Sequence, residues 1–289
     1  MNVSSNLRGI ACMVLASGTF VANDSFMKLA LADTPPLQVL FMRGVAATLW
    51  CVPLVFLLGY GRDILRVLNP WVLLRALFEI VAVVSFILAL NHMPIGDITA
   101  IFQIAPLLVV VGAALIWGER VGGLRMALIA LAITGALFIA QPGSATASPY
   151  AAFGFLTAIA SASRDIAGRN VPQDIPGIVV ALATIIAVML TAGAATAAFE
   201  TWAPPRTSNI LMMLAAGLFL IGGHTFVFLA FRFAKAAALA PFYYTFTLWA
   251  LISGLLVFGD IPNAMAITGM LLILAGGLAS VALDRRRIR

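Results

Sequence analysis

Residues 89–135 read ALNHMPIGDITAIFQIAPLLVVVGAALIWGERVGGLRMALIALAITG, and residues 230–276 read AFRFAKAAALAPFYYTFTLWALISGLLVFGDIPNAMAITGMLLILAG. The two stretches match in pattern at an offset of 141 residues. In each, a long apolar segment ends in an aromatic residue, a glycine and an acid, Trp117-Gly118-Glu119 and Phe258-Gly259-Asp260, and a second apolar segment follows. Such an internal repeat is typical of membrane proteins built by duplication, most of which are transporters.

The composition indicates that lipid is the solvent for most of this chain. Hydrophobic residues make up 63% of its 289 residues and charged residues 10%, against about 45–50% and 25% in an average soluble domain. The excess of 17 Lys and Arg over 11 Asp and Glu does not indicate nucleic-acid binding, because the basic residues stand singly between apolar runs and cluster only near the C-terminus. Cys12 and Cys51 lie inside apolar runs, so they predict neither a metal site nor a disulfide framework.

Ten apolar runs, separated by junctions that contain proline or glycine, are each about as long as the 20 residues that a spanning helix needs. The first run continues through Asn23, Asp24 and Ser25 to Leu31, which is too long for the apolar core of a signal peptide, so we expect an uncleaved helix. The expected fold is an all-α integral membrane protein with ten transmembrane helices. The predicted spans are residues 8–31, 37–58, 71–90, 96–117, 123–140, 151–170, 176–199, 208–232, 238–258 and 263–283.

Basic residues set the expected orientation. With a cytoplasmic N-terminus, 14 of the 17 Lys and Arg residues fall on the inner side, and only Lys28, Arg43 and Arg206 on the outer side. This is a strong positive-inside bias, so both termini are expected in the cytoplasm. The basic run at residues 284–289 is expected to anchor this end at anionic lipid.

The loop at residues 141–150 divides the spans into two sets of five. The predicted halves are residues 1–144 and residues 145–289. Because each half has an odd number of helices, the second half enters the membrane inverted relative to the first. Folds of this kind place a binding site near the midplane between the halves and work by alternating access.

One set of residues resembles a known family. Met93-Pro94-Ile95-Gly96-Asp97, followed by Ala100, Pro106-Leu107 and Trp117-Gly118-Glu119, is similar to the helix-four pattern of EamA-type proteins of the drug/metabolite transporter (DMT) superfamily. The resemblance covers nearly the whole chain, and within the family the chain most resembles YddG-type exporters of aromatic and neutral amino acids. It implies a ten-helix basket in the bacterial inner (plasma) membrane, with a central cavity lined mainly by helices one, three, four, six, eight and nine. It implies no catalytic residues.

Ionisable residues inside a span are costly, so we treat them as candidate site residues. Asn23, Asp24 and Lys28 lie on the first predicted helix and Arg43 on the second. At 1.5 Å per residue, Asp24 and Arg43 both lie about 10 Å below the outer surface, so an ion pair between them is feasible. Two interpretations stay open for this set: a structural lock between the two helices, or a polar lining of the outer vestibule.

Glu79 and His224 are the second candidate set. Glu79 is the deepest acid of helix three, and His224 lies at nearly the same depth on helix eight, so together they can accept a substrate amino group or couple transport to a proton. Each can instead face a neighbouring helix and bond a backbone carbonyl. Arg164 and Asp165, on the inner third of helix six, are candidates for closing a cytoplasmic gate by pairing with another helix. His92 and Asp97 border a short outer turn and are expected to be solvated.

Aromatic and hydroxyl residues form the third candidate set. On helix nine, Tyr244 and Thr247 share one face, and Tyr243 and Phe246 share another. One of these faces is expected to line the cavity, where rings stack and hydroxyls donate to an amphipathic substrate. Pro106 removes a backbone hydrogen bond from the middle of helix four, which predicts a bend and a gating point. The further candidates from helices four and nine are Phe102, Gln103 and Trp249.

These residues predict a secondary transporter of small amphipathic metabolites. Sparse charge near the midplane favours neutral or aromatic amino acids over nucleotides or sugar phosphates, which need several basic residues. Export of other metabolites or drugs, and a channel-like facilitator, stay open as alternatives. No enzyme signature such as His-Glu-x-x-His or Gly-x-Ser-x-Gly is present. We expect no cofactor, metal or nucleic acid; the expected partners are a small-molecule substrate, the lipid bilayer and, where transport is coupled, protons. One chain suffices as the working unit, and a dimer is left open.

Overall fold

The fold is all-α. A computed structural model describes residues 3–118, 122–141, 148–234 and 239–287, and every regular element in these ranges is a helix. The first elements are α1 (Val3–Ala30), α2 (Pro36–Leu57), the 3₁₀ helix η1 (Gly61–Leu68), α3 (Pro70–Leu90), α4 (Ile95–Phe102), α5 (Ala105–Trp117) and α6 (Gly123–Ala140). The others are α7 (Ala151–Gly168), α8 (Gly177–Phe199), α9 (Thr207–Phe233), the 3₁₀ helix η2 (Ala240–Tyr244), α11 (Thr245–Ser253), the π-helical turn η3 (Gly254–Phe258) and α12 (Ala264–Arg287).

Seven helical segments of the described residues are long and apolar enough to cross a membrane, by length and composition. Two further apolar helices, Met126–Ala140 and Ala264–Ser280, are shorter. Helix α7 is not among the seven segments, and it carries the charged residues Arg164 and Asp165 near its C-terminal end. The chain is therefore a multi-pass membrane protein. The seven segments are Asn6–Ala30, Pro36–Leu57, Pro70–Leu90, Ile95–Ile116, Gly177–Phe199, Thr207–Phe233 and Pro241–Phe258.

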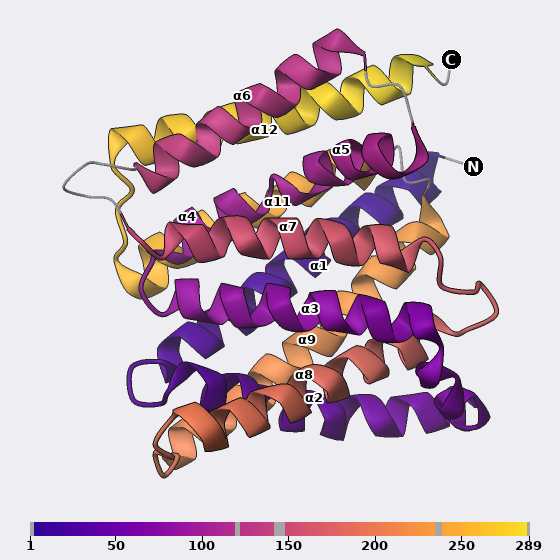
Figure 1. Ribbon diagram of the computed structural model, residues 1–289, viewed down its shortest axis with the longest axis vertical. Coiled ribbons are helices and arrows are strands. Elements are labelled where there is room, and N and C mark those ends of the chain that lie inside the picture. Colours follow the sequence, from indigo (N-terminus) through magenta and orange to yellow (C-terminus); the bar gives the residue numbers. More distant parts are fainter. Residues whose placement is uncertain (1–2, 119–121, 142–147, 235–238, 288–289) are drawn as a thin grey trace.

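The helices run between the same two ends of the bundle, with α1 and α9 oblique to α3 and α7 (Figure 1). Helices α6 and α12 pack together at one edge of the bundle, and α2 packs against α8 at the other. Between these edges α1 packs against α9, α3 packs against α7, and α4, α5 and α11 lie on the side of α6 and α12. Both termini lie at the same end of the bundle, which we call the terminal end; we call the other the opposite end.

Glycine forms the two repeated turns. Gly118, which follows α5, has φ 67°, and Gly259, which follows η3, has φ 68°. This left-handed conformation ends helices and suits glycine because it has no Cβ. The turns predicted to be equivalent from the 141-residue offset thus share one backbone conformation. Of the two acids that follow them, Asp260 is described and Glu119 lies outside the described residues.

Two predicted spans, residues 96–117 and 238–258, are interrupted rather than continuous. Helix α4 ends at Phe102 and α5 begins at Ala105, because Pro106 has no N–H to donate to the carbonyl of Phe102. The bend expected at Pro106 therefore lies on its N-terminal side. In the second span, 3₁₀ helix η2 precedes α11 and the π-helical turn η3 follows it. Mid-helix departures of this kind often mark hinges.

Candidate functional site

A half-buried ion pair joins α3 to α7. The Nη1 atom of Arg164 lies 2.6 Å from Oε2 of Glu79, and its Nη2 atom lies 2.8 Å from Oδ1 of Asp165. The side chains of Arg164 and Glu79 are only 21% and 19% exposed. A charge inside a membrane protein needs a countercharge nearby, and α3 and α7 provide both from adjacent helices. The sequence assigned Glu79 and Arg164 to separate sets, whereas the structure makes them direct partners.

His224 lies beside this ion pair rather than in it. Its ring packs edge-on against Phe20 of α1, with ring centroids 5.2 Å apart, and it interacts electrostatically with Glu79 and Arg164. Among the described residues no ion pair within 4.0 Å joins His224 to Glu79. The His224 side chain is nevertheless exposed, although charged residues of α3 and α7 surround it. His224 thus combines an exposed surface with charged neighbours on two other helices.

Asn23, Asp24 and Arg43 form a buried polar group between α1 and α2. Asn23 donates from Nδ2 to Oδ1 of Asp24 at 2.8 Å. Asp24 and Arg43 interact electrostatically, but within the described part of the chain no ion pair of 4.0 Å or less joins them. The direct pair that the matching depths made feasible is thus not formed. Arg43 also interacts with Glu79, which connects this group to the ion pair on α3 and α7.

Aromatic rings extend from His224 across three more helices. Phe20 of α1 lies 6.5 Å from Phe246 of α11, and Phe246 lies 6.1 Å from Phe102 of α4, both edge-on. Tyr243 is exposed and interacts electrostatically with Asp165 and Arg164. The face of helix nine that carries Tyr243 and Phe246 therefore points toward the charged residues. We call the rings of Phe20, Phe246 and Phe102 the aromatic row.

The other predicted residues of helices four and nine hold the interrupted segments together. Gln103 is buried and donates from Nε2 to the Tyr243 carbonyl at 3.0 Å, so it links the two breaks directly. Tyr244 is buried against Gly277 of α12. Trp249 donates from Nε1 to the Val14 carbonyl at 3.2 Å. Two members of the set make no such link: the Thr247 hydroxyl is buried without a partner among the described residues, and Pro106 is exposed.

A second ion pair lies at the opposite end of the bundle. Nζ of Lys28 lies 3.5 Å from Oδ2 of Asp260, donates to the Met93 carbonyl at 2.7 Å and stands 5.1 Å from the ring centre of Phe258. Asp97 interacts electrostatically with both charges, and its Oδ1 atom is buried without a partner among the described residues. The expectation that Asp97 is solvated is therefore wrong, because Asp97 lies in the first turn of α4 and one of its carboxylate oxygens is buried in the packed end of the bundle. Lys28 belongs here and not with Asp24.

Phe20 is the member of the aromatic row that the sequence reasoning missed. It lies one helical turn before Asp24, so the two residues share a face of α1. That spacing, an aromatic ring one turn from a membrane-embedded acid, was the available signal.

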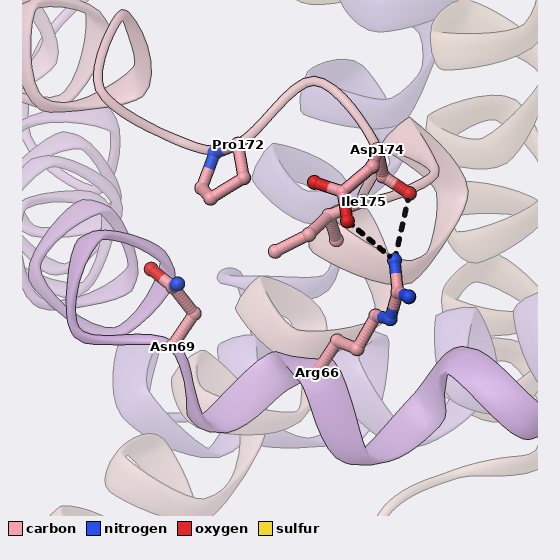
Figure 2. A pocket seen from close by; sticks show the side chains of 5 residues that line it. All are labelled: Arg66, Asn69, Pro172, Asp174 and Ile175. Carbon is pink, nitrogen blue, oxygen red and sulfur yellow. Dashed lines mark hydrogen bonds and ion pairs between the residues drawn. The ribbon is translucent and has the colours of Figure 1, made fainter.

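Two surface hollows lie away from these residues. One, of about 290 Å³, lies at the terminal end between η1 and the segment before α8. Figure 2 shows Arg66 in this hollow, with Nη1 at 2.9 Å from Oδ2 of Asp174 and 3.0 Å from its carbonyl oxygen. The other, of about 590 Å³, lies between α2 and α8 and is lined mostly by apolar residues, among them Phe41 and Leu190. Neither is lined by Glu79, Arg164, His224 or a residue of the aromatic row.

Comparisons with known proteins agree on the kind of protein. Residues 7–141 match the EamA-like transporter family. The pseudopaline exporter CntI of Pseudomonas aeruginosa is 28% identical over 96% of both chains. A riboflavin transporter of Rhizobium johnstonii is 29% identical over 97% of this chain and 93% of its own, and one of Vibrio cholerae is 22% identical over 89% and 87%. A crystal structure with 21% identity superposes at a TM-score of 0.66 over 99% of this chain and 100% of its own, which supports the fold.

These relatives support the broader of the expected functions. They are transporters of pseudopaline and riboflavin, so the specific likeness to YddG-type amino-acid exporters has no support among them. The chain is thus a multi-pass membrane protein that is similar over residues 7–141 to EamA-like transporters and similar along most of its length to transporters of pseudopaline and riboflavin.

Proposed function

We propose that the chain is a ten-span secondary transporter whose two inverted halves, residues 1–144 and 145–289, enclose a substrate cavity near the midplane. The packing of α6 against α12 supports the repeat. A Cβ atom at Gly135 would lie 2.6 Å from the carbonyl oxygen of Gly269, and one at Gly276 would lie 2.8 Å from that of Leu128. Gly135 and Gly276 are 141 residues apart, and so are Leu128 and Gly269.

The other helix contacts support the same symmetry. The predicted repeat pairs each span of the first half with the span five places later in the second half. When the two members of each pair are exchanged, the α1–α9 contact corresponds to the α7–α3 contact, and the α2–α9 contact to the α8–α3 contact. Likewise α1–α11 becomes α7–α5. The pairs at the two edges, α2–α8 and α6–α12, map onto themselves. These contacts recur, as a two-fold axis in the membrane plane requires.

The observation that carries the function is the exposure of His224 inside the bundle. An exposed histidine that packs on Phe20 and interacts with the Glu79–Arg164 pair indicates a hollow with a polar wall and an aromatic wall. Such a combination suits a small amphipathic solute, whose apolar part meets rings and whose polar part meets fixed donors and acceptors. Glu79, Arg164, Asp165, His224, Tyr243 and the aromatic row are the proposed lining.

We infer that the hollow is closed at the opposite end. There α4 packs against α11, the hydroxyls of Ser25 and Ser253 bond α1 to α11, and Lys28 pairs with Asp260. With both termini in the cytoplasm, as the basic residues predict, this closed end faces outward, and alternating access requires these contacts to open.

The substrate proposed from these features is a small metabolite with an aromatic or apolar body and a polar group. The riboflavin transporters and the pseudopaline exporter among the relatives support this broad class. Neutral and aromatic amino acids remain members of it.

Reconstitution in liposomes tests the function. Vesicles preloaded with unlabelled solute receive traces of labelled riboflavin or labelled L-phenylalanine, and saturable counterflow of either establishes a carrier. His224→Ala is expected to lower that flux about tenfold, the loss of roughly one hydrogen bond to a polar substrate group. Arg206→Gln, at an exposed pair with Asp33 away from the hollow, is the matched control and leaves flux unchanged. Flux that never saturates would instead support a channel-like facilitator, and the absence of any flux would sink the transporter proposal.

A further inference from the structure

A mostly apolar groove runs along one edge of the bundle, between α2 and α8, and has a volume of about 590 Å³. Three small residues of α8 line it, Gly193, Ala194 and Ala197. A Cβ atom at Gly193 would lie 2.8 Å from the ring of Phe41, so this ring packs directly on the helix backbone. The rings of Phe41 and Trp202, whose centroids are 6.3 Å apart, both line the groove. The groove therefore exists because α8 has little side-chain volume where its neighbours carry rings.

The groove has the length of one leaflet of the bilayer. Its lining extends from Leu190 of α8 to Glu200 and Trp202, which follow the end of that helix. The stretch from Leu190 to Glu200 rises about 15 Å, half of the roughly 30 Å hydrocarbon core. Leu190 lies near the middle of Gly177–Phe199, a segment long and apolar enough to cross a membrane. The groove thus runs from near the midplane to the surface at the opposite end.

Lipid chains are the medium that surrounds this edge of the protein. Leu190 and Phe199 of α8 are large apolar side chains that are exposed beside the groove. Trp202, exposed at the surface end of the groove, is of a residue type that concentrates at membrane–water interfaces. An empty groove forfeits van der Waals contacts that a closely fitting chain regains. Such packing, rather than the hydrophobic effect, drives association within a membrane.

The charge at the surface end of the groove is negative. Of the described residues that line the groove, Glu200 alone is charged. Its carboxylate accepts from the backbone N–H of Leu37 at 2.9 Å and from that of Gln38 at 3.0 Å. These bonds hold the carboxylate at the first turn of α2 and leave it lone pairs for a further donor. An ammonium group suits this position better than a headgroup with a net negative charge.

We propose that this groove binds one acyl chain of a phospholipid whose headgroup carries an ammonium group, in the leaflet at the opposite end. The chain lies along Gly193 and Ala197 against the ring of Phe41, and the ammonium group lies beside Glu200. Because α2 belongs to the first predicted half and α8 to the second, the bound lipid contacts both halves. The site lies away from the proposed solute hollow and does not depend on which solute is transported.

Lipid binding is measured on the purified full-length protein. The delipidated protein is titrated with phosphatidylethanolamine and, separately, with phosphatidylglycerol that has the same acyl chains, and bound lipid is counted by native mass spectrometry. Phosphatidylethanolamine is expected to bind about threefold or more tightly, which corresponds to a modest ion-pair contribution. A photoreactive group on its acyl chain is expected to label α8 between Leu190 and Glu200 more strongly than the other apolar helices.

Variants separate the acyl chain from the headgroup. Ala197→Phe fills the groove and is expected to weaken binding of both lipids at least about fivefold, because the chain loses its packing surface. Ala198→Phe, at the next exposed position of α8, which does not line the groove, is the matched control and binds lipid as the unaltered protein does. Glu200→Gln removes the charge and keeps an acceptor for α2, so it is expected to equalise the two lipids. Ala194→Leu serves where Ala197→Phe does not fold.

The outcomes that overturn the inference are specific to the groove. Equal lipid binding in Ala197→Phe and Ala198→Phe, or photolabel spread evenly over the apolar helices, overturns it. Equal or tighter binding of phosphatidylglycerol by the unaltered protein does so as well, and so does the failure of that protein to retain any lipid. A dimer that Ala197→Phe dissociates would assign the groove to a second copy of the chain instead. None of these results depends on counterflow, so they are distinct from failure of the transporter function.

Discussion

Two ion pairs in this molecule connect helices in different ways. Glu79 and Arg164 are 2.6 Å apart and join α3 to α7, two helices that pack along their lengths. Lys28 and Asp260 are 3.5 Å apart and join the end of α1 to the turn after η3. We call the first the central pair and the second the end pair. The central pair lies between helices that pack extensively together, whereas, under the proposed mechanism, the end pair lies across the end that opens.

The difference indicates different roles. The central pair is short and half-buried, so removing one partner strands a charge inside the bundle and costs much stability. The end pair is longer, and Lys28 has substitutes for Asp260 in the Met93 carbonyl and the Phe258 ring. Breaking it is therefore expected to cost less stability than breaking the central pair, and to lower the free energy of opening. The central pair is expected to govern folding and the end pair the balance between conformations.

The largest expected effect comes from locking the end that carries the end pair. The hydroxyls of Ser25 and Ser253 lie 2.6 Å apart, between α1 and α11. Cysteines at both positions, with Cys12 and Cys51 replaced by alanine, are expected to form a disulfide on oxidation and to abolish counterflow. Reductant should restore it. Each single cysteine variant is the control, since it cannot crosslink within one chain.

An oxidised double variant that transports normally would contradict alternating access through this end. Mass spectrometry of the oxidised protein establishes whether the crosslink has formed, so normal flux with a complete crosslink is decisive. It would also remove the reason to treat the end pair as a gate.

The next effect comes from the central pair. Arg164→Gln leaves Glu79 and Asp165 without their shared cation, and removing one partner of a buried pair costs about 3–5 kcal/mol. We expect a large fall in the unfolding midpoint in detergent. The double variant Glu79→Gln, Arg164→Gln removes both charges and is expected to recover most of that loss. If the single and double variants were equally unstable, packing rather than charge would explain the role of Arg164.

Much of the fold could be predicted because apolar length and breakers are local signals. Gly118 and Gly259 stand out in the sequence, and both turns adopt the same conformation. The interruption before α5 was anticipated from Pro106, although it lies on the N-terminal side of that residue. The departures around α11 were not predicted, because Pro241 stands at the start of that span and the sequence within it reads as an ordinary apolar helix.

Several residues of the candidate site were predicted from the sequence, but which of them pair with each other was not. Depth along a helix identified Glu79, His224, Asp24 and Arg43, because depth follows from counting residues. Which residue faces which depends on helix rotation, and a single sequence does not give that angle. The partner of Glu79 is Arg164 of α7. The depth of Arg164 along its helix did not indicate that α7 lies next to α3. Lys28 was grouped with Asp24 by proximity in the chain, whereas it reaches past the helix end to Asp260.

The smallest expected effect on stability comes from breaking the end pair. Lys28→Met keeps the long apolar stem and removes the ammonium group; the 3.5 Å separation makes this pair weaker than the central pair at 2.6 Å, although the two are similarly buried. The unfolding midpoint is therefore expected to fall less than in Arg164→Gln. Opening of this end is easier without the pair, so a cysteine at Ser253 should react several times faster with a membrane-impermeant maleimide than in a protein with Lys28 intact. Asp63→Asn, at an exposed pair with Arg66 near the terminal end, is the matched control because it removes a comparable contact away from this gate. Unchanged labelling together with a large loss of stability would invert the assignment, making the end pair a structural contact like the central one.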